Sequence, residues 1–149
     1  SARAVIPTII SQLLSGKKNI NLGSVYPTRD FTYVSDTVDA FVRALKPKNL
    51  FGQTINIGSN YEISIKRLVN EIAKLMNKKI TINFDKKRKR PTKSEVVRLR
   101  ASNSKAKKLL KWKPKNVGVQ GLKRGLSETI KWLEEEKNFR KYKHDIYNL

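Results

Sequence analysis

The apolar residues between positions 6 and 14 recur at helical spacing and predict an amphipathic helix near the start of the chain. Pro7 stands in its first turn, where a proline is tolerated, and Gly16 follows its end. Residues 20–22 then predict a short strand, which ends at Gly23-Ser24.

The next stretch alternates in hydrophobicity from Phe31 to Val34 and predicts a β-strand. Ser35 is placed to cap a helix that cannot continue through Pro47. Residues 54–57 predict a further strand. The buried stripe expected on the helix consists of Val38, Phe41, Val42 and Leu45.

The second half of the chain repeats the alternation of helices and strands. Ser64 is a candidate N-cap, and the helix after it has one apolar face. A strand at 79–84, a basic loop at 85–93 and a short helix at 104–110 follow. The last long helix is expected from about Val119 to Glu135, with Leu122, Leu126, Ile130 and Leu133 facing inward.

This order of elements predicts the α/β class, in one domain covering residues 1–149. The expected strands are too few and too scattered for a complete doubly wound sheet. We therefore expect the helix at 35–46 and the strand at 54–57 to belong to a sheet whose other strands lie outside this chain.

Composition narrows the candidate chemistry. The chain has 149 residues, which is enough for one domain with a core, and it has no cysteine. Hydrophobic residues make up 38%, below the usual share for a globular domain. Disulfides and thiolate metal sites are therefore excluded, and the single histidine, His144, cannot form a metal site alone. The sequence contains neither an apolar run of membrane-spanning length nor a charged-then-apolar leader, so a cytoplasmic location is the default expectation.

The net charge is +21, from 33 lysines and arginines against 12 acidic residues. Such a surplus favours a polyanionic partner, and a nucleic-acid-binding module without enzymatic activity is the alternative function. Lysine, asparagine and isoleucine are abundant together, however, which indicates a general composition bias. No nucleic-acid docking motif accompanies the charge, so we do not expect a nucleic-acid partner.

Four segments in order resemble one known family. They are Ser-Ala-Arg-Ala-Val-Ile-Pro-Thr-Ile-Ile at 1–10, Arg-Asp-Phe-Thr-Tyr-Val-Ser-Asp at 29–36, Thr-Ile-Asn-Ile-Gly-Ser at 54–59 and Asn-Ser-Lys-Ala-Lys-Lys-Leu-Leu-Lys-Trp-Lys-Pro at 103–114. The chain resembles the extended short-chain dehydrogenase/reductase family of NAD-dependent nucleotide-sugar epimerases and 4,6-dehydratases.

The resemblance covers only the C-terminal, substrate-binding portion of that family. It implies an NAD-binding Rossmann domain on the N-terminal side, with a glycine-rich turn and a Tyr-x-x-x-Lys pair, neither of which occurs in this sequence. We therefore expect no catalytic residue and no direct cofactor ligand in this chain. We also expect a truncated fragment that is inactive alone, and a full-length protein that is a homodimer acting on nucleotide sugars.

Two expected substrate contacts lie in the Arg-Asp-Phe motif. The resemblance implies that Arg29 reaches the substrate diphosphate, and a guanidinium fork matches phosphate oxygens bidentately. The alternative is a surface arginine paired with Asp30. Phe31 is implied to lie against the nucleotide, with simple core packing as its alternative.

Further expected contacts lie in the basic loop and after it. Arg90 precedes Pro91, as in the family's second phosphate-binding loop, so the resemblance implies that it binds phosphate. The alternative is that Arg90 is only one member of a solvated basic run that begins at Lys86. Glu95 corresponds to the acidic residue that holds the ribose hydroxyls, or else is a loop carboxylate neutralised by lysines. Arg98 competes with the other arginines for the phosphate role.

The last expected contacts are apolar. Val5, Ile6 and Leu22 match positions that sandwich the nucleotide base in relatives, and ordinary core packing is the alternative for all three. The sequence leaves open which base and sugar are bound, and whether the enzyme is a dehydratase or an epimerase.

Overall fold

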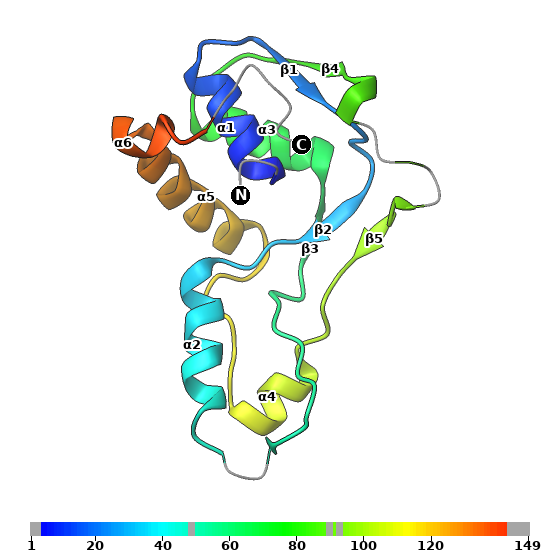
Figure 1. Cartoon of the computed structure of the whole chain (residues 1–149), viewed down its shortest axis with the longest axis vertical. Coiled ribbons are helices and arrows are strands. Elements are labelled where there is room, and N and C mark those ends of the chain that lie inside the picture. Colours follow the sequence, from blue (N-terminus) through cyan, green and yellow to red (C-terminus); the bar gives the residue numbers. More distant parts are fainter. Residues whose placement is uncertain (1–3, 48–49, 89–90, 92–93, 143–149) are drawn as a thin grey trace. The chain divides into compact units, whose positions relative to one another are not determined.

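A computed structural model of the chain describes residues 4–47, 50–88, 91 and 94–142. Helices and short strands alternate along it (Figure 1), which confirms the α/β class. The elements are α1 (Val5–Leu14), β1 (Asn19–Leu22), β2 (Thr28–Asp30), α2 (Val34–Ala44), β3 (Glu62–Ser64), α3 (Ile65–Leu75), β4 (Thr81–Phe84), the 3-10 helix η2 (Lys86–Arg88), β5 (Arg98–Leu99), α4 (Ser104–Leu110), α5 (Gly118–Glu134) and α6 (Glu136–Phe139).

The chain divides into two compact units, and each unit uses several separate segments. The first unit consists of Ser1–Pro27, Ser64–Val97 and Leu126–Leu149, and the second of Thr28–Ile63 and Arg98–Gly125. Each unit has a small sheet. Strands β1 and β4 pair in the first, and β3, β2 and β5 lie side by side in that order in the second.

The first unit contains two successive helix-to-strand segments. Helices α1 and α3 contact each other, and the strands that follow them, β1 and β4, pair in parallel from Asn19 opposite Thr81 to Leu22 opposite Phe84. The buried apolar side chains of this unit are Ile9, Ile10, Leu13, Ile20, Leu22, Ile65, Leu68, Val69, Ile72, Ala73, Leu126, Ile130 and Leu133.

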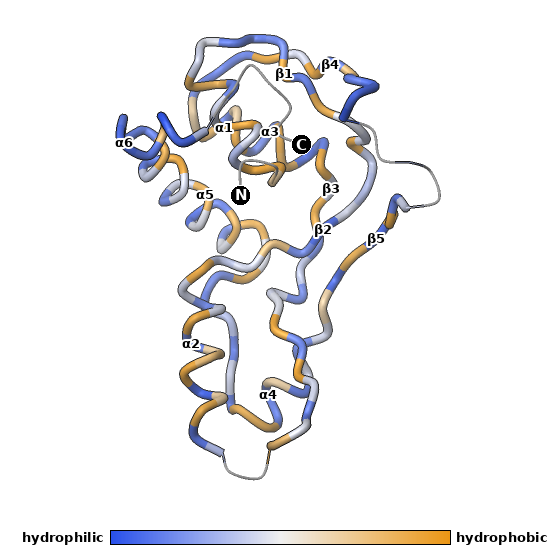
Figure 2. Tube along the Cα trace, in the orientation of Figure 1, coloured by the Kyte–Doolittle hydropathy of each residue, from blue (hydrophilic) through white to orange (hydrophobic). Residues whose placement is uncertain are grey.

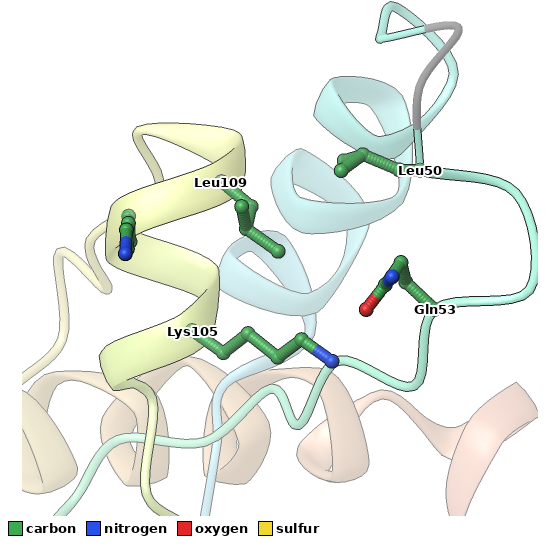
Figure 3. A pocket seen from close by; sticks show the side chains of 5 residues that line it. Leu50, Gln53, Lys105 and Leu109 are labelled. Atoms are coloured by element: carbon green, nitrogen blue, oxygen red, sulfur yellow. The ribbon is translucent and has the colours of Figure 1, made fainter.

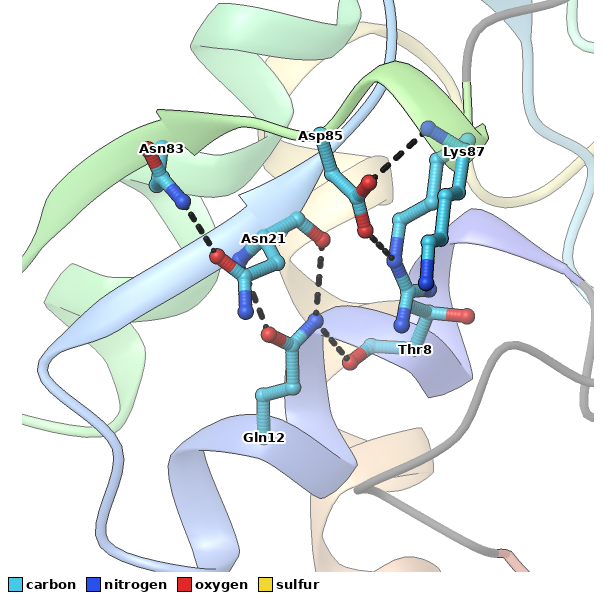
Figure 4. A network of polar contacts seen from close by, with 7 residues as sticks. Thr8, Gln12, Asn21, Asn83, Asp85 and Lys87 are labelled. Atoms are coloured by element: carbon cyan, nitrogen blue, oxygen red, sulfur yellow. Dashed lines mark hydrogen bonds and ion pairs between the residues drawn. The ribbon is translucent and has the colours of Figure 1, made fainter.

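A buried amide joins α1 to β1 in this unit (Figure 4). The Gln12 side chain donates to the carbonyl oxygens of Thr8, at 3.1 Å, and Asn21, at 3.3 Å, and accepts from the Asn21 N–H at 2.8 Å. On the strand, the side-chain amide of Asn83 donates to that of Asn21. Because its hydrogen bonds are made internally, burial of the Gln12 amide does not leave an unpaired polar group.

The core of the second unit forms around an indole ring. Ala40 on α2 and Ala106 and Leu110 on α4 pack with the fully buried Trp112. The indole N–H of Trp112 donates to the backbone carbonyl of Asp36 at 3.0 Å, so the ring is both buried and oriented. Leu50, Ile55 and Ile57 pack against this cluster.

Several predicted helices occur where the periodicity places them. Helix α3 begins after Ser64, whose hydroxyl accepts the N–H of Arg67 at 3.3 Å, as expected for an N-cap. Helices α1, α4 and α5 also match their expected ranges to within one or two residues. These helices depend mainly on local sequence, which explains why the spacing of apolar residues was sufficient to predict them.

The segment around the Arg-Asp-Phe motif differs from the prediction. The strand expected at 31–34 instead lies at Thr28–Asp30, and α2 begins at Val34 with Tyr33, rather than Ser35, at the N-cap position. The reason is Asp36, which is fully buried in the first turn of the helix and fixes where that turn lies. The strand expected at 54–57 is not assigned either, although Ile55 and Ile57 do pack inward.

The apolar stripe expected on α2 exists but is not buried within this chain. Val38, Phe41, Val42 and Leu45 are all exposed, Phe41 at 70% and Leu45 at 86%, whereas Ala40 is buried. Figure 2 shows the apolar residues along this helix in orange. Exposure of these side chains is the outcome expected if they pack on a sheet that this chain does not contain.

None of the helices in the described part of the chain combines the length and the apolarity needed to cross a bilayer.

Candidate functional site

The strands β3, β2 and β5 of the second unit carry the two described arginines predicted to bind phosphate. Strand β2 is central, and β5 pairs with it in parallel, with Thr28 opposite Arg98 and Arg29 opposite Leu99. Strand β3 flanks β2 on its other side and contributes Glu62.

One charged pair crosses this small sheet. The Arg98 guanidinium donates from Nε to both carboxylate oxygens of Glu62, at 2.8 and 2.9 Å, and from Nη2 to Oε1 at 2.5 Å. The Thr28 hydroxyl donates to Glu62 Oε2 at 2.8 Å. These hydrogen bonds lower the pKa of Glu62 from 4.5 to about 2, with the larger effect from Arg98, and the pairing raises the pKa of Arg98.

The aspartate of the Arg-Asp-Phe motif is a backbone anchor. Asp30 Oδ1 accepts from the N–H and hydroxyl of Ser59, at 3.0 and 2.5 Å, and Oδ2 accepts from the N–H groups of Asn60, at 2.9 Å, and Ala101, at 3.2 Å. The carboxylate thereby ties the end of β2 to two distant segments. A side chain at Gly58 would clash here, because its Cβ would lie under 3.0 Å from Ala101.

A second aspartate, at the end of the segment 29–36, has a similar role. The buried carboxylate of Asp36 accepts from the backbone N–H groups of Lys115 and Asn116, both at 3.0 Å, and from the Asn116 side chain at 3.2 Å. Together with the bond from Trp112 to the Asp36 carbonyl, these contacts fix the start of α2 against the segment that precedes α5. The motif therefore has a stable backbone on both sides of Phe31.

Arg29 lies between two anchored neighbours. It is half-buried on β2, and its Nη1 donates to the Thr28 carbonyl at 2.8 Å. Successive side chains of a strand point to opposite faces, so Arg29 projects from the face opposite to Thr28 and its partners Glu62 and Arg98. The two arginines therefore do not form one guanidinium pair. Phe31, just after the strand, is half-buried.

The other predicted site residues fall mainly in the first unit. Val5 and Ile6 form the first turn of α1 and are half-buried, Leu22 ends β1 and is buried, and Glu95 is half-buried before β5. Arg90 lies outside the described residues. The roles of these residues in substrate binding stay predictions.

Sequence reasoning missed the carboxylates that organise this region. Asp30 and Asp36 both stand in the segment 29–36 that carries the family resemblance, so they were available as candidates. Glu62 gave no signal, because its partner Arg98 is 36 residues away and both lie on very short strands.

A separate depression of about 330 Å³ lies beside α4 (Figure 3). Lys105 extends across it from α4, and its ammonium donates to the Thr54 carbonyl at 2.9 Å. The remaining lining residues are Leu50, Gln53, Lys108 and Leu109. None of the predicted substrate contacts lines this depression, so it is not part of the candidate site.

Three of the described glycines lie where chain segments approach each other closely. A Cβ on Gly58, Gly121 or Gly125 would meet other protein atoms, so these glycines serve close chain packing rather than a phosphate cradle. No Gly-x-Gly-x-x-Gly run occurs in the sequence. Among the residues that the structure describes, no group of three or more histidine, aspartate or glutamate side chains could hold a metal.

Comparisons with known proteins identify the wider family. The family described as GDP-mannose 4,6 dehydratase matches residues 2–124, which is most of the chain. A human dTDP-D-glucose 4,6-dehydratase is 32% identical over 145 residues, which cover 94% of this chain and 39% of that protein.

Solved structures agree with this match. A UDP-glucuronic acid 4-epimerase from Bacillus cereus, in complex with NAD and a fluorinated UDP-glucuronic acid, is 31% identical and has a TM-score of 0.77 over 89% of this chain and 40% of its own. An NAD complex of dTDP-glucose 4,6-dehydratase from Bacillus anthracis is 28% identical, with a TM-score of 0.74, over 91% of this chain and 40% of its own.

This chain thus spans about 40% of the length of these proteins. The match of one family over most of the chain, in both sequence and structure, identifies the four motif segments as parts of a single pattern. The chain belongs to the GDP-mannose 4,6-dehydratase family, within the NAD-dependent nucleotide-sugar epimerases and dehydratases of the extended short-chain dehydrogenase/reductases.

Proposed function

We propose that residues 1–149 form the substrate-binding C-terminal portion of an NAD-dependent nucleotide-sugar 4,6-dehydratase or 4-epimerase. The observation that carries this proposal is the position of Arg29, half-buried on β2 between two residues whose side chains are held by other segments. A guanidinium on such a fixed backbone is preorganised to bind a diphosphate, because little further ordering is needed on binding.

The geometry favours Arg29 over Arg98 for this role. Arg98 already binds a carboxylate in bidentate fashion, and binding a phosphate with the same donors would release Glu62 as an unpaired charge. We therefore assign Arg98 to holding β5 against β2 and β3, and Arg29 to the diphosphate. Arg90 is the proposed second phosphate contact.

The remaining predicted contacts complete the proposed nucleotide site. Phe31, Val5, Ile6 and Leu22 would supply apolar surface to the base, and Glu95 would accept hydrogen bonds from the ribose hydroxyls. Hydride transfer belongs to NAD held by an N-terminal half, because this chain offers neither a glycine-rich loop nor a tyrosine–lysine pair. The contribution of this portion is to hold the substrate in position for that half.

The test is a comparison of two proteins with a panel of UDP-, dTDP- and GDP-sugars. One protein is the 149-residue chain, and the other is the same chain behind its NAD-binding half. We expect the longer protein to be stabilised against heat by one class of nucleotide sugar and to turn it over. The 149-residue chain should show no turnover. Turnover by the shorter chain, or no response of the longer protein to any nucleotide sugar, would contradict the proposal.

A further inference from the structure

The two strands of the first unit end with a pair of apolar residues in register. β1 and β4 are parallel, with Asn21 opposite Asn83 and Leu22 opposite Phe84. The side-chain amide of Asn83 donates to that of Asn21 at 2.7 Å, so these two residues share one face of the sheet (Figure 4). Successive side chains alternate between faces, so Leu22 and Phe84 share the other face. They therefore lie side by side at the carboxyl ends of the two strands.

These two neighbours differ in exposure. Leu22 is 5% exposed and Ile20, on the same face, is fully buried, whereas Phe84 is 53% exposed. The packing that covers this face thus extends to Leu22 but leaves much of the Phe84 ring open. A single exposed apolar side chain is common on protein surfaces, so the exposure of Phe84 carries meaning only together with its position.

The residue after Phe84 fixes that position. The Asp85 N–H donates to the Leu22 carbonyl at 2.8 Å, and the Asp85 carboxylate accepts from the Lys87 N–H at 2.9 Å and from Arg88 Nε at 3.0 Å. These hydrogen bonds turn the chain into the short helix η2 directly after the strand. The backbone at Phe84 is therefore held at the end of the sheet, and little further ordering is needed for its ring to bind a ligand.

The first turn of α1 lies towards the same end of the first unit. Residues 15–18 connect α1 to β1, and Gln12 near the end of the helix bonds with Asn21 of the strand, so the helix and the strand run in opposite directions. The start of α1 is thereby directed towards the end at which the strands finish. Two of the three residues expected to contact the base are on that first turn, and the third is Leu22. All three therefore belong to the end of the unit where Phe84 is exposed.

We propose that Phe84 stacks on the nucleotide base of the substrate. In open sheets of parallel strands, ligands bind outside the carboxyl ends of the strands, which is where this ring lies. An aliphatic side chain such as Leu22 offers a base only apolar contact, whereas an aromatic ring also offers a stacked geometry to a planar partner. Every base has a π-face, so Phe84 raises the affinity for nucleotides without selecting one base. The inference rests on the proposed function, because it adds a residue to the base site assigned there.

The test measures binding of UDP, dTDP and GDP, without a sugar, by calorimetry to the protein that carries this chain behind its NAD-binding half. Phe84→Ala should weaken binding of the nucleotide that the wild type binds by about tenfold. Phe84→Leu should weaken it similarly, because it keeps an apolar side chain but lacks a ring. Phe84→Trp should bind within about threefold of the wild type. The control is Phe51→Ala, which removes an 88% exposed ring from the second unit and should bind within about twofold.

Two further readouts separate stacking on a base from packing within the protein. In Phe84→Leu, the affinity for NAD and the melting temperature without nucleotide should equal those of the wild type. A fall in either one alongside the loss of nucleotide binding would overturn the stacking role. Wild-type nucleotide affinity in Phe84→Ala or Phe84→Leu would also overturn it, as would an equal loss in Phe51→Ala.

Arg29→Ala in the same assay keeps this proposal apart from the proposed function. Weaker nucleotide binding in Arg29→Ala, with Phe84→Ala unaffected, would remove the stacking role and leave the proposed function standing. A wild type that binds none of the three nucleotides would contradict the proposed function itself, and the stacking role with it.

Discussion

Glu62 and Arg98 face each other across the central strand of a three-stranded sheet. Their strands, β3 and β5, lie on opposite sides of β2, and the guanidinium of Arg98 contacts both carboxylate oxygens of Glu62. The pair therefore joins the outer strands directly, while Thr28 of β2 donates to the same carboxylate. This arrangement gives very short strands a side-chain connection that their few backbone hydrogen bonds do not provide.

The first prediction concerns the pH dependence of stability. The folded-state pKa of Glu62 is about 2, below its ordinary value of 4.5, so the pair stabilises the fold fully above about pH 4.5. This contribution should be lost as the pH falls from there towards 2. In Glu62→Gln, the free energy of unfolding should be lower at neutral pH and should decline less over that acid range, as measured by urea unfolding at successive pH values.

A conservative change provides the matched variant. Arg98→Lys keeps the charge but removes the two-pronged geometry, so its stability at neutral pH should lie between those of the wild type and Glu62→Gln. Identical acid profiles for the wild type and Glu62→Gln would show that this pair does not contribute to stability.

The second prediction concerns the close approach at Gly58. In Gly58→Ala the new methyl group would meet Ala101 and would lie 3.1 Å from Asp30 Oδ2, so we expect a loss of about 1–3 kcal/mol of stability from overpacking. Adding Ala101→Gly should restore much of this loss. Denaturant unfolding of both single variants and the double variant forms a thermodynamic cycle, and simple additivity of the two effects would refute the contact.

The third prediction compares two aspartates of α2. Asp36 is buried and accepts three hydrogen bonds, whereas Asp39 pairs with Arg43 at the surface. Asp36→Ala should cost about 1–3 kcal/mol, because it leaves the N–H groups of Lys115 and Asn116 without their acceptor. Asp39→Ala should cost roughly 0.5 kcal/mol, as is usual for an exposed helical pair. Thermal unfolding of both variants tests this, and equal losses would contradict the anchoring role of Asp36.

These contacts also show what the sequence could predict. Helices α1, α3, α4 and α5 follow from local apolar periodicity, and the Ser64 cap follows from a single residue type. Strands β2 and β5 have three and two residues, too few for an alternation to be recognised. The position of α2 was predicted approximately. The exposure of its apolar stripe agrees with the expectation that the stripe packs on strands outside this chain.

The candidate site, too, has features that the sequence could predict and features that it could not. The residue types in the Arg-Asp-Phe motif pointed to phosphate chemistry, and that motif does lie on an anchored strand. The pairing of Glu62 with Arg98 could not be foreseen, because it requires the order β3, β2, β5 of three segments that are distant in sequence. That Arg29 and Arg98 point to opposite faces of the sheet could not be predicted either, because this depends on the register of β2 against β5.

The fourth prediction concerns the exposed apolar face of α2. Val38, Phe41, Val42 and Leu45 form a hydrophobic stripe, so the 149-residue chain should self-associate through it or be marginally stable. Phe41→Ser with Leu45→Ser should raise the monomer fraction in sedimentation velocity at a given concentration. Exposed Thr54→Ser serves as a control that leaves the stripe intact. A monomeric wild type with a high, concentration-independent melting temperature would count against this.

The fifth prediction addresses the diphosphate contact in the protein that carries this chain behind its NAD-binding half. Arg29→Ala should weaken nucleotide-sugar binding by about 1.5–3 kcal/mol, the range for a hydrogen bond to a charged group. Affinity for NAD should hardly change, because we propose that the N-terminal half binds most of the cofactor. Arg67→Ala, which removes an exposed arginine from the first turn of α3, is the matched control and should leave both affinities unchanged.

The most direct measurement is therefore calorimetric titration of the wild type, Arg29→Ala and Arg67→Ala with the same nucleotide sugar and, separately, with NAD. Our account predicts a loss of nucleotide-sugar affinity in Arg29→Ala alone, with NAD binding preserved in all three proteins. Unchanged nucleotide-sugar affinity in Arg29→Ala would contradict it.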